Sequence, residues 1–433
     1  MPLLYTFYGD DFTGSTDVLE QLALHGVPAL LFFAPPSQEQ LRSFGPVLAF
    51  GVAGESRSRP PEWMDEHLPA ILHSLAASGA RVVHYKVCST FDSSPGQGSI
   101  GRAMELGLAA VGSRFAPIVV GAPHLRRFVW EGRLFAAAPS GVIQRIDRHP
   151  MSRHPVTPMR EADLRRHLAA QTGMPIGLVS HDDLDGAEHA SAALEREVAG
   201  GAAAVLFDTV DVASLDVTGR ILWREAERRQ LFGVGSSGLT AALIHAWRRA
   251  GLLPERPTET AVTREAPLLV LSGSCSPMTA RQIEWALRNG FAGRRLDPGT
   301  LCGAAPRDAA LEQVVSDAVS SLGAGKSVVL YTALGGATSR VAGEALGCAL
   351  GRLLREILER VRVRRVVLCG GDTSSHAVQQ LGLSALSWLA SLQTGAPLCR
   401  AHFAAAEHRP LELVLKGGQV GTEDFFAVAR GDM

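Results

Sequence analysis

The chain has 433 residues, 46% of them hydrophobic and 20% charged, and its formal net charge at pH 7 is −1. This length exceeds the size at which one hydrophobic core keeps growing, so the composition indicates an ordinary globular protein of two or three domains. The balanced charge argues against nucleic acid or an acidic membrane as partners, and the apolar stretches are too short to span a membrane.

The cysteines and the first residues bear on the cellular compartment. Six cysteines are scattered along the chain without a Cys-x-x-Cys motif, which argues against a disulfide framework and against a structural zinc site. The first residues lack the basic region and cleavage site of a secretory signal. We therefore expect a cytoplasmic protein.

Strand-like apolar runs alternate with helical periodicity along the chain. In the first part the runs cover residues 3–7, 29–33, 47–50, 81–85, 118–120, 176–179, 203–207 and 231–234, with helical stretches such as 63–77 and 100–111 between them. Later runs cover residues 268–271, 327–331, 366–369 and 411–415. This alternation predicts an α/β fold with mostly parallel sheets flanked by helices.

A polar stretch divides the chain. Residues 254–267 contain three prolines and no hydrophobic periodicity, so we interpret them as a linker between domains at 1–253 and 268–433. A cleft between two α/β domains is a common place for a small-molecule site, and we expect the active site there.

Two adjacent carboxylates follow the first strand. Asp10 and Asp11 lie in a Gly-Asp-Asp-Phe-Thr-Gly turn that leads into an amphipathic segment at 18–25. Open α/β sheets bind ligands at such strand ends, and paired carboxylates there are costly unless they bind a cation, take a proton or cap a helix. Taken alone, the pair is better explained as a helix cap than as a catalytic site.

Further polar groups follow two other strands of the first domain. Arg57 follows the run at 47–50, and Lys86, Ser89 and Thr90 follow the run at 81–85. Cations beside hydroxyl donors suit an anionic, hydroxylated substrate, although isolated residues of this kind are more often solvated. A dense cationic loop at 145–155 fits an anion site about as well as an exposed basic turn.

Three loops of the second domain carry glycines after a strand, and two of them also carry hydroxyl groups. They are Ser-Gly-Ser-Cys-Ser at 272–276, Gly-Gly-Asp-Thr-Ser-Ser at 370–375 and Lys-Gly-Gly-Gln-Val-Gly at 416–421. Backbone amides in such turns bind phosphate oxygens. One such loop is weak support, but three of them, with Lys416 and with Asp372 as a candidate Mg²⁺ ligand, favour a polyphosphate site.

The Gly-Gln-Gly-Ser-Ile-Gly stretch at 96–101 fits the formula of a dinucleotide loop. It does not directly follow a strand, however, and no acidic residue lies at the distance expected for a ribose contact. We interpret it as a substrate loop that opens a helix.

With these residues in this order, the sequence resembles the four-carbon acid sugar kinases, the ATP-dependent oxo-tetronate, threonate and erythronate kinases. The matching motifs extend over almost the whole chain: Asp-Asp-x-Thr-Gly at 10–14, Ser-Arg at 56–57, Lys-x-x-Ser-Thr at 86–90, Pro-Val-Thr-Pro at 155–158, Gly-Ser-x-Gly at 235–238, Ser-Gly-Ser at 272–274, Gly-Gly-Asp-Thr at 370–373 and the loop at 416–421. The resemblance implies a sugar-acid-binding domain, a nucleotide-binding domain, and transfer of the ATP γ-phosphate to a terminal hydroxyl of a small, four-carbon acid.

On this basis we assign roles to individual residues. Asp11, with Asp10 as the alternative, would be the general base; Arg57 and Lys86 would hold the substrate carboxylate, and Ser89 and Thr90 its hydroxyls. The residues around ATP would be Ser272, Ser274, Gly370, Gly371, Asp372, Thr373, Lys416, Gly417 and Gly418, with Mg²⁺ bridging the phosphates. We assign no metal ligand, and a homodimer is considered.

The sequence departs from the family pattern where the sugar acid should bind. The usual Lys-x-Asp-Ser-Thr motif is followed by Leu-Arg-Gly, whereas here Cys88 replaces the Asp and Phe91-Asp92-Ser93 replaces the tripeptide. The last loop also differs, at Gly417, Gln419 and Val420. These changes alter charge and donors, so the sequence does not identify the acid. Two alternative functions are a sugar-acid or nucleotide sensor without catalysis, and a nicotinamide-dependent dehydrogenase that uses the loop at 96–101.

Overall fold

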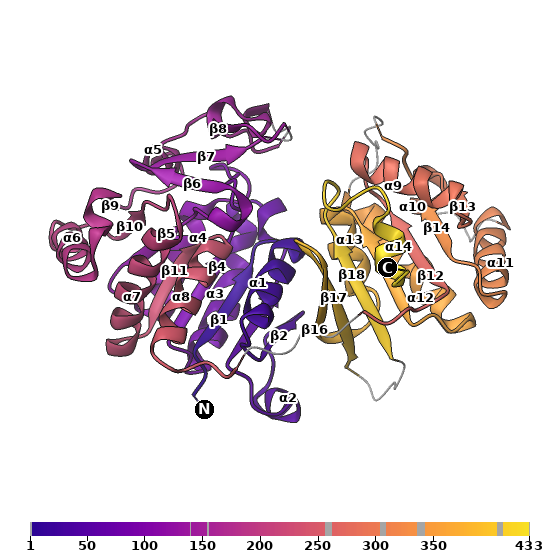
Figure 1. Cartoon of the computed structure of the whole chain (residues 1–433), viewed down its shortest axis with the longest axis horizontal. Helices are drawn as coiled ribbons and strands as arrows, with labels where there is room; N and C mark the ends of the chain where they lie inside the picture. Colours follow the sequence, from indigo (N-terminus) through magenta and orange to yellow (C-terminus); the bar gives the residue numbers. More distant parts are fainter. Residues whose placement is uncertain are drawn as a thin grey trace. The chain divides into compact units, whose positions relative to one another are not determined.

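The computed structural model describes residues 2–138, 140–153, 156–255, 262–303, 309–335, 343–404 and 410–432. The chain forms two compact units (Figure 1). Unit 1 comprises Met1–Ala29 and Ala34–Pro257, and unit 2 comprises Leu30–Phe33 and Thr258–Met433. Residues 256–261 of the predicted linker lie outside the described part of the chain.

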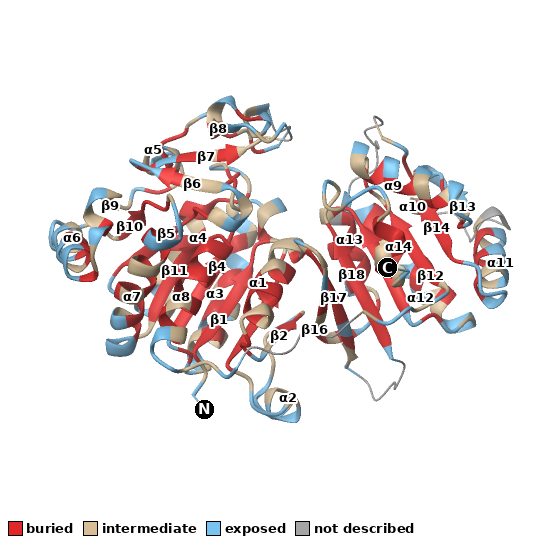
Figure 2. Cartoon of the chain, in the orientation of Figure 1, coloured by how far each residue is buried: buried red, intermediate tan, exposed pale blue. Residues whose placement is uncertain are grey.

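The large sheet of unit 1 consists of parallel strands. They lie in the order β3 (Ala49–Ala53), β1 (Tyr5–Gly9), β4 (Val82–Lys86), β11 (Leu231–Gly235), β5 (Ala116–Val119), β10 (Ala204–Phe207) and β9 (Ile176–Val179). The central strands are buried along their whole length (Figure 2), as expected for strands covered on both faces. Because parallel strands end at one edge, the loops after β1, β3 and β4 lie side by side.

Helices cover both faces of this sheet. On one face α3 (Pro61–Ala77) packs against α4 (Ile100–Val111), and on the other α1 (Phe12–Leu24), α8 (Ser237–Arg249), α7 (Val212–Arg228) and α6 (Ala187–Ala199) pack in series. The short helices α2 (Gln38–Ser43) and α5 (Leu164–Ala169) lie in the connections. The segment predicted at 18–25 covers only the second half of α1, because Asp11 caps this helix and starts it at Phe12.

A small antiparallel sheet lies beside the edge of unit 1 at which the parallel strands end (Figure 1). It contains β6 (Arg127–Trp130), β7 (Arg133–Ala137) and β8 (Ile143–Arg145). Val129 of β6 pairs with Thr209, just after β10, and the buried Asp208 carboxylate accepts the backbone N–H groups of Glu131 and Gly132 at the hairpin turn. The sequence analysis did not predict this sheet.

Unit 2 has a mixed sheet. Parallel strands lie in the order β13 (Ala292–Arg295), β14 (Val328–Tyr331), β12 (Leu268–Ser272), β15 (Arg365–Cys369) and β18 (Leu411–Lys416). Antiparallel strands follow: β17 (Ala396–Phe403), β16 (Leu383–Gln393) and β2 (Ala29–Phe32). The β2 segment comes from the N-terminal part of the sequence and pairs with β16 through Leu31 and Phe32.

The helices of unit 2 are α9 (Pro277–Arg288), α10 (Pro298–Cys302), α11 (Ala309–Gly323), α12 (Gly343–Arg360), α13 (Gly371–Gln379) and α14 (Phe425–Arg430). Helices α12 and α13 pack closely because Gly347 and Gly351 of α12 leave room for the backbone of α13. The core between the sheet and α9 and α14 is apolar, with Ile283, Phe425 and Phe426 inaccessible to solvent.

The predicted fold class, α/β with two domains and mostly parallel sheets, is confirmed. Every apolar run singled out in the sequence overlaps a strand. The long β16–β17 hairpin was missed because its residues show no clean alternation. Among the described residues, no helix is long and apolar enough to cross a membrane.

Candidate active site

The turn after β1 places two carboxylates against one arginine. Arg57, in the 3₁₀ turn after β3, donates from Nε and Nη2 to the two oxygens of Asp10, at 3.1 and 2.7 Å, and from Nη1 to Asp11 Oδ2 at 2.6 Å. Asp11 Oδ1 accepts the backbone N–H of Gly14 at 2.7 Å and caps α1. Arg57 and Asp11 therefore lie at the same edge of the sheet, in direct contact.

Asp10 is the more deeply buried of the two acids, with 4% of its surface exposed. Burial raises the pKa of the Asp10 carboxyl to about 6; the Arg57 guanidinium opposes this rise, and the Asp11 carboxylate adds to it. Burial alone would lower the pKa of Arg57, but the same two carboxylates hold it well above its ordinary value. Arg57 therefore stays charged and orients both acids.

Lys86 ends β4 next to this cluster. Its side chain is almost fully buried, and Nζ lies 3.9 Å from Asp17 Oδ2. A Cβ at Gly14 would lie 2.8 Å from Lys86 Nζ and 2.5 Å from Asp11 Oδ1, so Gly14 is what lets the ammonium approach the first turn of α1. Within the described part of the chain, Asp17 is the one carboxylate in ion-pair range of this ammonium.

The loop after β4 brings the two unusual residues together. Thr90 Oγ1 lies 2.5 Å from Asp92 Oδ1 and 2.9 Å from Cys88 Sγ, and Phe91 between them has a φ of 58° in the left-handed region. Burial raises the pKa of the Cys88 thiol, and the Asp92 carboxylate adds to this effect. Cys88 is thus a neutral thiol at pH 7. Ser89, the other predicted hydroxyl, is half-buried in this loop.

The loop at 96–101 supports this cluster from behind. Gly98, with a φ of 61°, lies against the carbonyl of Arg57, and its N–H donates to the carbonyl of Arg59. Ser99 caps α4. Gly98 and Gly101 allow the backbone to approach Arg57 and Gln171 closely, which accounts for these two glycines without a dinucleotide.

The three glycine loops of unit 2 meet at one edge, because β12, β15 and β18 are neighbours and parallel. A Cβ at Gly273 would lie 2.4 Å from the Thr373 side chain, and a Cβ at Gly418 would lie 2.8 Å from Ser274 Oγ. Gly370 has a φ of 114°, which only glycine adopts readily, and α13 starts at the next residue. The loops therefore form a cradle of backbone amides around a helix N-terminus.

Gly371 is the open position of this cradle, since a Cβ there would meet nothing within 4 Å. Ser374, in the first turn of α13, was missed in the sequence: it is 1% exposed, and its Oγ has no hydrogen-bond partner among the described residues. The side chain of Asp372 and residue Pro155 of the Pro-Val-Thr-Pro motif lie outside the described part. Asp372 as a Mg²⁺ ligand stays a prediction.

Lys416 is bonded to groups of its own loop and of α9. Its ammonium is fully buried and donates to the carbonyls of Gly417 and Val420, at 2.9 and 3.0 Å, and to Thr279 Oγ1 at 3.3 Å. Burial lowers its pKa. These bonds hold the third loop in shape; nucleotide binding by Lys416, Gly417 and Gly418 stays a prediction.

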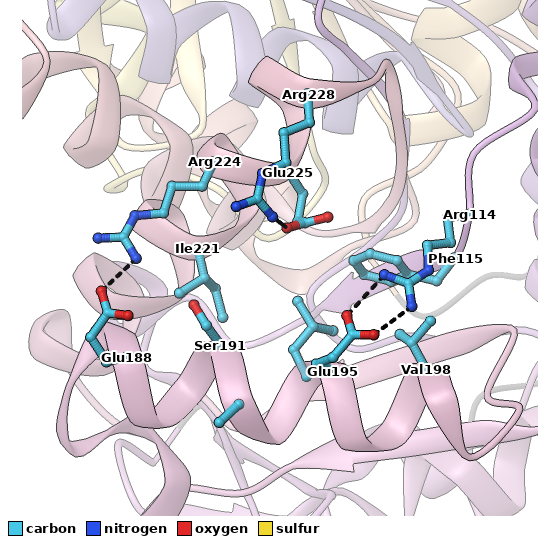
Figure 3. A pocket seen from close by; sticks show the side chains of 12 residues that line it. Arg114, Phe115, Glu188, Ser191, Glu195, Val198, Ile221, Arg224, Glu225 and Arg228 are labelled. Atoms are coloured by element: carbon cyan, nitrogen blue, oxygen red, sulfur yellow. Dashed lines mark hydrogen bonds and ion pairs between the residues drawn. The ribbon is translucent and has the colours of Figure 1, made fainter.

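Two other charged features of unit 1 contain internal ion pairs. A hollow of about 370 Å³ lies along α6 and α7, and in it Arg114 pairs with Glu195 and Arg224 with Glu188 (Figure 3). In the cationic loop at 145–155, Arg145 grips Asp147 through two hydrogen bonds. His154 of that loop lies outside the described residues. Neither feature contains a predicted site residue.

Comparison with known proteins matches both units. Residues 5–243 match the model of a sugar-binding N-terminal domain, and residues 269–426 that of a nucleotide-binding C-terminal domain. The 3-oxo-isoapionate kinase of Paraburkholderia graminis is 44% identical, covering 99% of this chain and 94% of that protein. The 3-oxo-tetronate kinase of Cupriavidus necator is 33% identical, covering 96% and 94%.

Solved structures agree on the fold. A Salmonella typhimurium LT2 protein, described as a candidate tRNA synthase, aligns with a TM-score of 0.81 and 26% identity over 99% of both chains. A Haemophilus influenzae protein of family DUF1537 aligns with a TM-score of 0.75 and 27% identity, over 98% of this chain and 99% of that one.

Proposed function

Because this chain belongs to the four-carbon acid sugar kinase family, and is therefore an ATP-dependent kinase of a small sugar acid, we propose that its acceptor is a 3-oxo sugar acid of the kind named for the Paraburkholderia relative. The support is the 44% identity over 99% of the chain, against 33% for the 3-oxo-tetronate kinase of Cupriavidus. In this reaction a hydroxyl oxygen of the acid forms a bond to the γ-phosphorus, and ADP leaves.

The observation that supports nucleotide binding by unit 2 is its cradle of three glycine loops. Its three loops present backbone amides at the edge of adjacent parallel strands, which suits the oxygens of a polyphosphate. Ser274, Thr373 and Ser374 add hydroxyl groups there. Among the described side chains no cluster of three or more His, Cys, Asp or Glu could hold a metal ion. Mg²⁺ would thus be held chiefly by the phosphates, where it offsets their charge.

The acid pair of unit 1 carries the proton chemistry. Asp11 is the more exposed acid, with 17% of its side chain accessible against 5% for Asp10, and we assign it as the base that takes the proton of the acceptor hydroxyl. Each carboxylate oxygen has a second lone pair, so its bonds to Gly14 and Arg57 leave it able to accept another hydrogen. Asp10 fixes Arg57, and Arg57 fixes Asp11.

Lys86 is the cation of this cluster that remains available to the substrate. The N–H groups of Arg57 are already bonded to Asp10 and Asp11. The predicted contact of Arg57 with the substrate carboxylate therefore requires that these N–H groups be shared between the two acids and the substrate. Lys86 has one carboxylate at 3.9 Å within the described part of the chain. Thr90 and Ser89 lie on the adjacent loop, where their hydroxyls can meet those of the acid.

An assay of ADP release with ATP, Mg²⁺ and a panel of C3 to C6 sugar acids tests the proposal. We expect the highest kcat/KM with a 3-oxo-isoapionate-type acid and lower values with 3-oxo-tetronates. Asp11→Asn is the matched control, because Asn caps a helix as well as Asp does but cannot take the proton. We expect kcat to fall by about 10²–10⁴-fold with ATP binding retained. Near-normal turnover would remove Asp11 from the base role, and no turnover with any acid would refute the proposal.

A further inference from the structure

Arg127, the first residue of β6, is held in place by one nitrogen of its guanidinium. Nη1 donates to the carbonyls of Leu125, Arg126 and Ala137, at 3.1, 3.3 and 3.4 Å. The backbone of Arg127 also pairs with Ala122 in both directions. These bonds fix the plane of the guanidinium and leave the opposite edge, formed by Nε and Nη2, to other partners.

That edge has no partner in the described part of the chain. Nε of Arg127 is buried without a hydrogen bond, and the bonds of this side chain all leave from Nη1. Elsewhere in unit 1 the same pair of nitrogens grips a carboxylate side-on, in Arg57 with Asp10, Arg145 with Asp147 and Arg165 with Asp163. The Nε–Nη2 edge is therefore the side of this guanidinium that is left for a carboxylate.

The charges around Arg127 also favour an anionic ligand at this side chain. Burial lowers the pKa of Arg127, and the one group that opposes this is the Cys88 thiol, whereas carboxylates raise the pKa of Arg57. His149, whose pKa is lowered chiefly by burial, also faces Arg127; its Nε2 donates to the carbonyl of Ala137 and its Nδ1 accepts the N–H of Met151. A half-buried cation without a counter-ion is costly, and an anionic ligand would remove that cost.

Arg127 also belongs to the substrate side of unit 1. Its backbone pairs with Ala122, which follows β5 at the edge where the parallel strands of this sheet end, and Cys88 acts electrostatically on both Arg127 and Arg57. Strand β6 crosses the edge at which the parallel strands end, through the pairing of Val129 with Thr209.

We propose that Arg127 binds the carboxylate of the sugar acid through its Nε–Nη2 edge. The inference rests on the proposed kinase function and deepens it. It separates two tasks: Arg57 orients Asp10 and Asp11 at the acceptor hydroxyl, and Arg127 holds the acid group at the other end of the substrate. The selectivity for acids over neutral sugars then comes from Arg127.

The test compares the best acid of the panel with its carboxamide, in the wild type and in variants of the full chain. We expect Arg127→Gln to raise the KM for the acid by about 100-fold, with a smaller change in kcat and an unchanged KM for ATP. The preference for acid over carboxamide should fall at least tenfold. Arg127→Lys should recover only part of the affinity, because an ammonium keeps the charge but not the fork. Arg133→Gln, at an exposed arginine of the neighbouring strand β7, is the control and should behave as the wild type.

Several outcomes would overturn the inference: an unchanged KM in a folded Arg127→Gln protein, a rise in the KM for ATP instead, or equal use of acid and carboxamide by the wild type. The last comparison needs no variant, so it can refute the inference even if Arg127→Gln fails to fold. If the wild type releases no ADP with any acid, the proposed function fails separately. Thermal stabilisation of wild type and Arg127→Gln by sodium threonate then still tests the arginine, and equal stabilisation would refute it.

Discussion

Asp11 is both a helix cap and the candidate base. These roles are compatible, because the cap uses one carboxylate oxygen and Arg57 the other, and each oxygen can accept a further hydrogen. The cap fixes the side chain relative to α1, so the base is oriented before substrate arrives. A sequence argument that weighs cap against catalysis as alternatives is therefore incomplete.

The first prediction at the residue scale concerns pH. Below pH 6 Asp10 takes up a proton, because its pKa is raised to about 6, and its two-pronged bond to Arg57 is lost. We expect kcat/KM to fall as the pH drops through 6. In Asp10→Asn the activity should be lower throughout, without an acidic limb at this pH. An identical limb in wild type and variant would show that another group titrates.

The second prediction concerns Cys88. Replacing the neutral thiol by a carboxylate adds charge beside Asp92 and Arg57, where the acid is expected to bind. In Cys88→Asp we expect the kcat/KM ratio of 3-oxo-tetronate to 3-oxo-isoapionate to rise by about tenfold, the range that changed pocket contacts produce. Cys88→Ser, which stays neutral, is the control and should keep the wild-type ratio. An unchanged ratio in Cys88→Asp would show that residue 88 does not influence which acid is preferred.

At the scale of elements, glycine loops after parallel strands serve two purposes. Gly273 and Gly418 allow neighbouring loops of the protein to touch, since a Cβ at either would collide with a side chain. Gly371 faces open space instead. A substitution at Gly371 therefore tests ligand binding without disturbing the packing of the loops.

Gly371→Ala is the third prediction. The new methyl group meets no protein atom and improves helix propensity, so the free energy of unfolding should stay the same or rise slightly. The methyl group would occupy space needed by a phosphate, and we expect the KM for ATP to rise about tenfold or more. Gly323→Ala, at the end of α11, also meets open space and should leave the KM unchanged. Wild-type ATP affinity in Gly371→Ala would exclude this position from the phosphate site.

His84 ties β4 to two other elements. Its Nδ1 accepts the hydroxyl of Tyr5 on β1 at 2.5 Å, its Nε2 donates to the carbonyl of Gly235 at 3.0 Å, and Tyr5 also bonds to Thr240 on α8. Burial lowers the pKa of His84 to about 3, and the bond to Gly235 opposes this shift only in part. The ring is therefore neutral in the folded protein.

A fourth prediction follows from that neutrality. In the unfolded chain His84 titrates near 6.5, so between pH 6.5 and 3 the unfolded state binds the extra proton. Its contribution to the free energy of unfolding is complete above pH 6.5 and is lost as the pH falls, by up to about 1.4 kcal/mol per pH unit. Urea unfolding at pH 7.5, 6.5 and 5.5 should show a smaller loss in His84→Asn, which starts from lower stability. Equal slopes would contradict this account.

The fifth prediction, at the scale of the whole molecule, is that each ligand protects a different unit from amide hydrogen exchange. ATP with Mg²⁺ should slow amide hydrogen exchange in residues 272–276, 370–375 and 417–421, because these amides would bind phosphate. The sugar acid should slow it in residues 10–14 and 86–92. At a free concentration of one hundred times its Kd, each ligand stabilises the folded state that binds it by about 2.7 kcal/mol. Asp11→Asn should keep the protection by ATP; protection of 10–14 by ATP alone would contradict the assignment of units.

The expected homodimer stays a prediction, to be tested by sedimentation.

The sequence by itself determined the strand order along the chain and the residues that follow each strand. Buried parallel strands are continuous apolar runs, so β1, β4, β12 and β15 were visible, and the polar residues after them shared one edge by the rule of parallel sheets. That was enough for the Asp10–Asp11 turn, for Arg57 and for the three glycine loops. The ordered motifs also indicated the family.

Tertiary structure decided what each side chain faces. The sequence could not show that the donors of Arg57 point at Asp10 and Asp11, that Lys416 is consumed by carbonyls of its own loop, or that the Nε–Nη2 edge of Arg127 has no protein partner among the described residues. The physical reason is that a cationic side chain binds a ligand through the N–H groups that are not already bonded to protein acceptors. Some of those acceptors are distant in sequence, as Asp10 is from Arg57, and others, such as Gly417 and Val420 beside Lys416, are near in the chain but are brought into contact only by the folded loop.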